Sequence, residues 1–251
     1  MSSSQSFELA AADGKLIRGD RSMGRDRQVL FITGFLSKRW GNKSKALAQW
    51  CQEQGWGFCC YDVRGFGDSE GTFTDYTLSD WVADARLVLD ALKAGPPMTI
   101  VGNSLGGWIA WLIAQEFELV DRLILIAPAF NMMGVRAESI PAARREVWQS
   151  TGWMPWDDDP LHKDWPLSWK WVEESEAYWQ TTFNRLRPVQ TTILHGLQDT
   201  VILPDGSREF ARLLSAKAPT YPIDLNVIPG DHRLSSPEHV ERFHQLVLEQ
   251  P

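Results

Sequence analysis

Residues 99–115 read TIVGNSLGGWIAWLIAQ, and this stretch decides how the chain folds. It starts with β-branched and apolar residues typical of a buried strand and ends with a nearly all-apolar segment long enough for a helix. Ser104 lies at the junction, between Gly102 and Gly106. Glycines at these two places indicate a turn so tight that larger side chains would collide. We therefore predict a sharp strand-to-helix turn that raises Ser104 above the end of the strand.

Short apolar runs alternate with amphipathic segments on both sides of this turn. Residues 6–20 predict a hairpin with Asp13 and Gly14 at its turn. The alternation predicts an α/β fold, in which helices cover both faces of a mostly parallel sheet and ligands bind at the carboxyl ends of the strands. The further strands are predicted at 28–35, 56–62, 98–102, 121–127, 190–196 and 223–230, and the helices at 43–55, 77–93, 105–117, 203–217 and 236–250.

The alternation stops after the sixth predicted strand. Residues 128–187 form a different kind of segment, from which we predict a small helical cap, while residues 1–127 and 188–251 form the core domain. Two interpretations of the tryptophans in the cap stay open: they pack the cap onto the core, or some of them line an apolar pocket. Seven of the thirteen tryptophans lie there: Trp148, Trp153, Trp156, Trp165, Trp169, Trp171 and Trp179.

Composition narrows the class of protein. The chain of 251 residues is 43% hydrophobic, enough for a full core, and its net charge of −7 argues against nucleic acid or an anionic membrane as the main partner. We find no apolar run long enough to span a bilayer, no signal peptide, and no Cys or His cluster with zinc spacing. Cys59 and Cys60 are neighbours on a predicted strand and should point to opposite faces, which favours reduced, buried thiols. We expect a cytoplasmic protein without metal or cofactor.

A serine nucleophile needs a base, and the chain has five histidines. His232 follows the last predicted strand, at the edge of the sheet where ligands bind, and we assign it as the base. His195 ends an earlier strand and is expected to be structural. His162 lies in the cap, and His239 and His244 lie on the last helix as expected surface or packing residues.

The base in turn needs an acid that orients it. Asp199 follows the predicted strand 190–196 and precedes His232, in the chain order Ser, acid, His that this kind of turn favours. Asp205 lies at the start of the next helix and is expected to cap it. Asp231 adjoins His232, but neighbouring side chains diverge, so we expect it to shape the loop. The predicted catalytic set is therefore Ser104, Asp199 and His232.

Two backbone N–H groups are needed to bind an oxyanion. One is assigned to Leu105, because it follows the nucleophile at the start of a helix. The other should come from the loop after strand 28–35, where we assign Phe35, with Leu36 as the alternative.

At this point the chain resembles the α/β-hydrolase superfamily over nearly its whole length. The motifs that carry the resemblance are GFGDSEG, GNSLGGW, HGLQDTVI and GDHRL. GFLSKRWGNKSKALAQWC, GNSLGGW and DHRL are similar, more closely, to the mitochondrial family of acyl-glucuronide esterases and palmitoyl-protein thioesterases. The resemblance implies an α/β-hydrolase fold, deacylation of oxygen or sulfur esters, and catalytic positions at Ser104, Asp199 and His232.

These inferences combine into one functional hypothesis. We predict a serine hydrolase that cleaves carboxylic esters or thioesters through an acyl-enzyme on Ser104, with a small-molecule or acyl substrate that carries an apolar or aromatic group. Two alternatives stay open. One is an enzyme of the same fold with different chemistry, such as carbon–carbon hydrolysis or perhydrolysis, and the other is a non-catalytic ligand receptor. The sequence does not indicate an oligomeric state.

Overall fold

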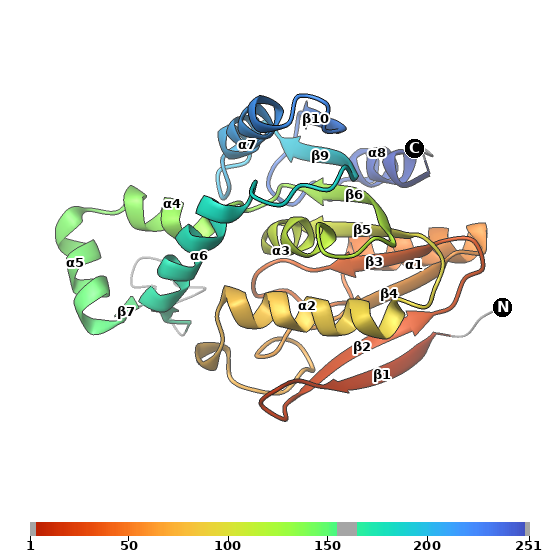
Figure 1. Ribbon diagram of the computed structural model, residues 1–251, viewed down its shortest axis with the longest axis horizontal. Coiled ribbons are helices and arrows are strands. Elements are labelled where there is room, and N and C mark those ends of the chain that lie inside the picture. The colour runs from red at the N-terminus through yellow and green to blue at the C-terminus, as the bar shows by residue number, and fades with distance from the viewer. Residues whose placement is uncertain (1–3, 155–164, 249–251) are drawn as a thin grey trace.

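An eight-stranded sheet lies at the centre of the computed structural model, which describes residues 4–154 and 165–248 (Figure 1). The strand order is β1-β2-β4-β3-β5-β6-β9-β10. The β1–β2 and β2–β4 pairs are antiparallel and all other neighbours are parallel, so the predicted mostly parallel sheet is confirmed. The strands are β1 (Gln5–Ala10), β2 (Leu16–Ser22), β3 (Gln28–Ile32), β4 (Gly57–Tyr61), β5 (Met98–Asn103), β6 (Val120–Ile126), β9 (Gln190–Gly196) and β10 (Ile223–Ile228).

Helices cover both faces of this sheet. Strands buried on both faces have runs such as GFCCY in β4, in which every residue is buried. Side chains alternate between the faces, so Cys59 packs in the core beside α2 and α3, and Cys60 packs in the core beside α1 and α8. Their predicted opposite directions are confirmed, and both thiols are free. The helices of the core are α1 (Asn42–Gln54), α2 (Leu78–Leu92), α3 (Leu105–Ala114), α7 (Pro204–Lys217) and α8 (Pro237–Leu248).

Local signals placed the ends of several elements correctly. The β1–β2 turn is centred on Asp13 and Gly14, and the positive φ of Gly14, 79°, suits glycine. The carboxylate of Asp80 accepts a hydrogen bond from the N–H of Thr77 at 2.9 Å, and this capping pair begins α2. Gly55 ends α1 in the left-handed conformation.

A helical insertion separates β6 from β9, at the place predicted for the cap. Figure 1 shows it beyond one end of the strands, on the left, with α5 farthest from the sheet. Trp148 and Trp171 are buried in it, whereas Trp153 and Trp165 are partly exposed, and Trp156 lies outside the described residues, as does His162. The elements of the insertion are α4 (Met132–Ser139), α5 (Ala142–Thr151), β7 (Trp153–Met154), β8 (Leu167–Ser168) and α6 (Trp169–Thr181), and a short 3-10 turn, η1 (Phe73–Asp75), lies earlier in the chain between β4 and α2.

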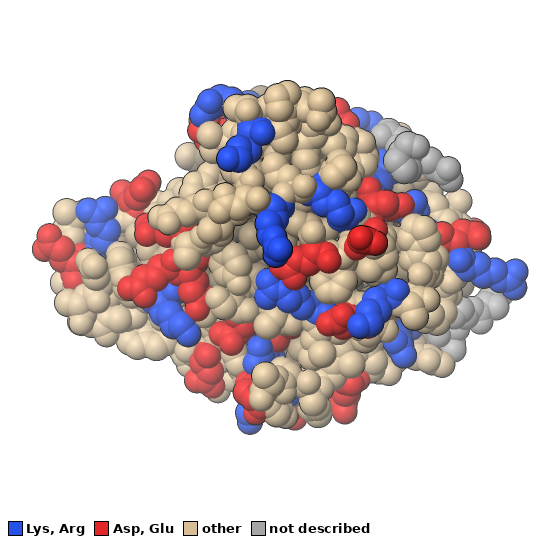
Figure 2. Space-filling view, viewed as in Figure 1, with Lys and Arg blue, Asp and Glu red and all other residues tan. Residues whose placement is uncertain are grey.

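Charge is mixed over the surface that Figure 2 shows. Basic and acidic side chains lie among one another there, and the coloured residues of this face form no broad basic area. Within residues 4–154 and 165–248, no helix combines the length and apolar character needed to cross a bilayer.

Candidate active site

Ser104 occupies a strained turn between β5 and α3. Its backbone has φ 54° and ψ −119°, a conformation that costs energy for a residue with a side chain. The N–H of Ser104 donates to the carbonyl of Ile126 on β6 at 2.8 Å, and its own carbonyl accepts from Ala129 at 3.0 Å. These contacts hold the turn, and the side chain of Ser104 lies above the carboxyl end of the sheet. The predicted strand-to-helix turn is thus present.

The two glycines around Ser104 are required by close contacts of the backbone. A Cβ added to Gly102 would lie 2.4 Å from the carbonyl oxygen of Gly106. A Cβ added to Gly106 would lie 2.3 Å from the carbonyl oxygen of Ile32, at the end of β3. The glycine spacing therefore lets α3 cross directly over β5 and β3, which carries Ser104 to the edge of the loop that follows β3.

His232 lies beside Ser104 although 128 residues separate them in the chain. It follows β10, whose parallel pairing with β9 brings the loop to the same edge of the sheet. Its Nε2 lies 3.1 Å from Oγ of Ser104, and its Nδ1 lies 2.6 Å from Oδ2 of Asp199. One imidazole thus joins the predicted nucleophile to the predicted acid.

The loop that carries His232 is held from two sides. Oδ1 of Asp231 accepts hydrogen bonds from the N–H groups of Arg233 and Leu234, at 3.1 and 3.0 Å. Nζ of Lys43, in the first turn of α1, donates to the carbonyl of Arg233. Burial lowers the pKa of Lys43 to about 8. Asp231 therefore shapes the loop, as predicted, and has no recorded contact with the imidazole.

Asp199 is buried in the loop after β9. Oδ1 accepts the N–H groups of Val201 and Ile202, each at 2.9 Å, and Oδ2 accepts from His232. Burial opposes ionisation, but hydrogen bonds from His195, His232 and the backbone of Ile202 outweigh it and hold the pKa of the Asp199 carboxyl well below its usual range. Asp199 is therefore ionised at neutral pH, which suits a group that orients an imidazole.

Asp205 differs from its predicted role, and His195 makes a contact that was not predicted from the sequence. Asp205 does not cap α7, because Leu203 occupies the N-cap position, and the carboxylate of Asp205 instead pairs with Arg208 at 2.6 Å on the surface. His195 does end β9, as predicted, but its ring contacts Asp199 directly, at 3.1 Å between Nε2 and Oδ2. The motif HGLQD contained the signal, since a strand-end histidine four residues before an acid faces the same loop.

The two candidate oxyanion donors lie on either side of Ser104. Leu105 begins α3, where the first N–H groups have no acceptor within the helix. Phe35 belongs to the loop after β3, and a Cβ added to its neighbour Gly34 would lie 3.2 Å from Cβ of Ser104. The alternative, Leu36, has a positive φ of 54°. Both predicted donors therefore sit in segments that border the nucleophile, and their role stays a prediction.

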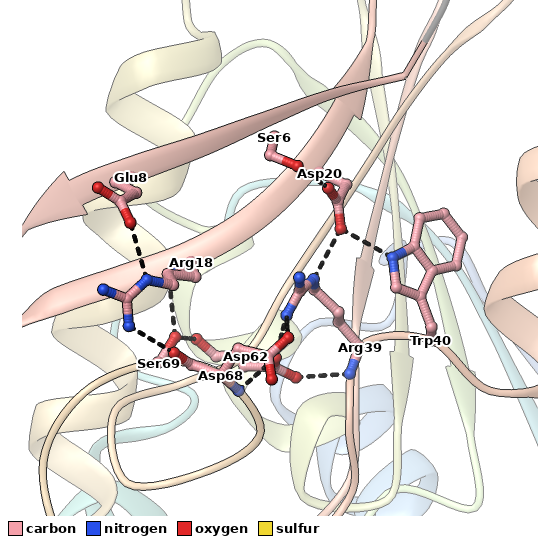
Figure 3. A network of polar contacts seen from close by, with 9 residues as sticks. All are labelled: Ser6, Glu8, Arg18, Asp20, Arg39, Trp40, Asp62, Asp68 and Ser69. Atoms are coloured by element: carbon pink, nitrogen blue, oxygen red, sulfur yellow. Dashed lines mark hydrogen bonds and ion pairs between the residues drawn. The ribbon is translucent and has the colours of Figure 1, made fainter.

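Arg39 ties the loop after β3 to two neighbouring strands (Figure 3). Its guanidinium donates to Asp62 at 2.5 Å and to Asp20 at 2.7 Å, and its backbone N–H donates to Asp62 at 2.5 Å. Asp20 also accepts from Nε1 of Trp40 at 2.7 Å. The Asp62 side chain is 1% exposed. Burial lowers the pKa of Arg39, but the neighbouring carboxylates together outweigh it and hold that pKa well above its usual range. This Arg39 cluster therefore holds the loop that carries Phe35, although the motif around Arg39 did not indicate which carboxylates it would bind.

Aromatic rings surround Phe35 on its other side. Its ring lies 5.2 Å from that of Trp171 on α6, 5.5 Å from Phe73 and 5.9 Å from Phe66. Trp165 packs on Phe73 at 5.4 Å. The helical insertion thus contacts the loop beside Ser104 through aromatic side chains.

Among the described residues, no group of three or more His, Cys, Asp or Glu side chains could hold a metal ion.

The sequence and fold match known hydrolases. Residues 25–153, just over half of the chain, match the family described as serine aminopeptidase, S33. The chain belongs to this family. The protein is therefore a serine hydrolase, and the resemblance inferred from its motifs is confirmed.

Individual hydrolases are also similar to this chain in sequence or in fold. The mouse protein named palmitoyl-protein thioesterase ABHD10, mitochondrial, is 27% identical over 233 residues, which cover 85% of this chain and 71% of the mouse protein. The solved structure of alpha/beta hydrolase domain-containing protein 10 from mouse matches with a TM-score of 0.84 at 22% identity, covering 97% of this chain and 96% of that one. A putative hydrolase from Agrobacterium vitis S4 matches with a TM-score of 0.82 at 22% identity, covering 98% of both chains. The fold is the α/β-hydrolase fold.

Proposed function

We propose that the protein hydrolyses carboxylic esters or thioesters through an acyl-enzyme on Ser104. The observation that carries this proposal is the hydrogen-bonded chain from Oγ of Ser104 through His232 to Asp199, with contacts of 3.1 and 2.6 Å. These three hydrogen-bonded residues lie at the carboxyl ends of parallel strands, where open α/β sheets bind ligands. The mouse relative named a palmitoyl-protein thioesterase supports the choice of ester and thioester substrates.

The reaction follows from these contacts. His232 Nε2 takes the proton of Ser104 as Oγ attacks the acyl carbonyl, and the N–H groups of Phe35 and Leu105 stabilise the oxyanion. The imidazolium returns the proton to the leaving alcohol or thiol, which departs and leaves an acyl group on Ser104. A water molecule then loses a proton to His232 as it attacks the acyl-enzyme. The imidazolium returns that proton to Oγ of Ser104 as the bond between Oγ and the acyl carbon breaks, which releases the carboxylic acid. Asp199 holds the imidazole in the required tautomer and stabilises the imidazolium.

The helical insertion supplies the substrate surface in this proposal. Residues 128–187 form a cap on the core of residues 1–127 and 188–251, and the cap contacts the candidate oxyanion loop through Trp171 and Phe35. An apolar or aromatic acyl group fits this aromatic surrounding, because burying it there removes apolar surface from water.

The alternatives differ in what they require. A ligand receptor needs no serine hydrogen-bonded to an oriented imidazole, so the geometry disfavours it. Carbon–carbon hydrolysis and perhydrolysis would use the same three residues, and turnover of simple esters separates them from the proposed activity.

Covalent labelling tests the proposal most directly. A fluorophosphonate probe should modify the folded protein once, and peptide mapping should find the adduct on Ser104, while Ser104→Ala should not react. A panel of p-nitrophenyl esters and acyl thioesters of increasing chain length should then show turnover. Labelling at another residue, or none in the folded wild type, would exclude Ser104 as the nucleophile.

A cytoplasmic location is part of the same proposal. The buried free thiols of Cys51, Cys59 and Cys60 fit a reducing compartment. The names of the mouse and human relatives carry the word mitochondrial, so the alternative is an organelle. Cell fractionation with an antibody against the native protein distinguishes the two.

A further inference from the structure

His195 lies against the candidate catalytic acid and is fully buried. Its Nε2 is 3.1 Å from Oδ2 of Asp199 and 2.9 Å from the carbonyl oxygen of Ile202. Its Nδ1 is 2.8 Å from Oγ of Ser207, in the first turns of α7. The proposed reaction assigns no task to this imidazole, although both of its nitrogens have partners.

The partners determine where the ring proton lies. An ionised carboxylate and a backbone carbonyl both accept hydrogen bonds and donate none, so Nε2 of His195 must carry the proton that both oxygens share. The hydroxyl of Ser207 then donates to Nδ1. This assignment rests on the hydrogen-bond network, which is how histidine tautomers are inferred.

His195 completes the set of donors around Asp199. The backbone of Val201 and Ile202 supplies two donors to Oδ1, while His195 and His232 supply two to Oδ2. Both histidines therefore compete for the same carboxylate oxygen. The donation from His195 draws electron density from Oδ2, and it also restrains the oxygen that His232 contacts.

We propose that His195 is a positioning residue that holds Oδ2 of Asp199 toward His232 and weakens the attraction of that oxygen for the imidazolium formed during catalysis. This inference rests on the proposed function and assigns a role to a residue outside the Ser104–His232–Asp199 chain. Without His195, His232 would be the single side-chain donor to Oδ2 among the residues that the structure describes, and the imidazolium would be stabilised more strongly. The base would then keep its proton to higher pH.

No other charged group in the described residues makes a recorded polar contact with His195. Asp199 faces its Nε2, and Ser207 and the Ile202 carbonyl are neutral. His232 lies on the far side of Asp199 and shares Oδ2. A change in pH dependence on replacing His195 is therefore transmitted through Asp199.

The test compares the pH dependence of kcat/KM in three folded variants, with p-nitrophenyl acetate as substrate. His195→Leu removes the donor, so Oδ2 is no longer held toward His232. The plateau of kcat/KM should therefore fall by about tenfold, which corresponds to the loss of one hydrogen bond. It should also move the acidic limb of the profile upward by about half a pH unit. His195→Gln can place an amide N–H near the same oxygen, so its limb should lie at the wild-type pH. Thr192→Val, a buried change on the same strand with no recorded contact to Asp199, is the control and should leave the limb unchanged.

The outcomes are distinct. A folded His195→Leu variant whose limb stays at the wild-type pH would overturn the inference, whatever its plateau, since a merely structural residue would lower activity at every pH alike. An equal shift in Thr192→Val would also overturn it. If His195→Leu does not fold, long-range ¹H–¹⁵N spectra of the wild type decide: protonation at Nε2 supports the inference, and an Nδ1–H tautomer contradicts it. A wild type that neither turns over esters nor labels at Ser104 would instead refute the proposed function.

Discussion

Nδ1 of His232 lies 2.6 Å from Oδ2 of Asp199, whereas the carboxylate of its chain neighbour Asp231 bonds to backbone N–H groups of its own loop. Two parallel strands, β9 and β10, end side by side and bring His232 and Asp199 together across 33 residues. Chain proximity alone would have favoured Asp231.

Replacing each acid in turn tests this pairing. Asp199→Asn should lower kcat by about 10⁴-fold, because the amide favours the wrong tautomer of His232. Asp231→Asn should cost far less, because it changes the loop and leaves the imidazole contact in place. Steady-state kinetics on both variants measure the two effects, and the opposite ranking would show that the acid is wrongly assigned.

The low pKa of Asp199 predicts how folding stability responds to acid. A carboxyl whose pKa is lower in the folded protein stabilises the fold above its unfolded value of about 4, and this contribution is lost as pH falls toward the folded value. The wild type should therefore be more stable than Asp199→Asn at pH 7. The difference in the free energy of unfolding between the two proteins should decrease as pH falls from about 4 to 3. Urea unfolding of both proteins across this range measures it. A difference in stability that increases in acid would contradict a lowered pKa of Asp199 in the folded protein.

Gly106, in the strand-to-helix turn at Ser104, has a matched control in α7. In Gly106→Ala the new methyl group would meet the Ile32 carbonyl at 2.3 Å, so the variant should lose about 1–3 kcal/mol of stability and most of its activity. A Cβ at Gly206 meets no atom within 4 Å, so Gly206→Ala should raise stability by about 0.5–1 kcal/mol. Thermal and urea unfolding compare the two. Equal effects would mean that the contact between Gly106 and the Ile32 carbonyl is not tight.

Arg39 should matter far more than an arginine in an exposed pair. Arg39→Met leaves the buried carboxylate of Asp62 without its guanidinium and should cost about 3–5 kcal/mol. Arg208→Met breaks an exposed pair with Asp205 and should cost about 1 kcal/mol or less. At matched folded fraction, Arg39→Met should also reduce kcat more than it raises KM, because the loop with Phe35 loosens. A kcat equal to wild type would separate the Arg39 cluster from catalysis.

The tryptophans of the insertion should divide into two groups. Trp148 is fully buried and donates from Nε1 to the Leu167 carbonyl at 2.9 Å, so Trp148→Ala should cost about 3–5 kcal/mol and lower all activities together. Trp165 is 36% exposed and packs on Phe73, next to the loop beside Ser104. Trp165→Ala should raise KM for octanoyl esters and leave acetyl ester turnover near wild type. If the two esters respond alike, Trp165 does not contact the acyl group.

Much of the candidate site could be predicted because its signals are local. The pattern Gly-x-Ser-x-Gly predicts one tight turn. The distances at Gly102 and Gly106 show the backbone contacts that exclude a larger side chain at both positions. Asp199 and His232 could be chosen because each follows a recognisable strand, and parallel strands end at one edge. The prediction that Asp205 caps α7 was wrong. An acid in the first turn suits a helix N-terminus, but the carboxylate of Asp205 pairs with Arg208 on the same helix.

From the chain alone we could predict the alternation of strands and helices, the strand-to-helix turn at Ser104 and the order of the catalytic candidates, because periodicity and turn chemistry act over a few residues. Which distant groups share a partner depends instead on how the folded chain packs. Asp62 and Asp20 meet Arg39 because β4 and β2 are neighbours in the sheet. His195 and His232 share Oδ2 of Asp199 because β9 and β10 end side by side. Such contacts depend on how segments pack around a buried charge, and no short pattern in the chain encodes them.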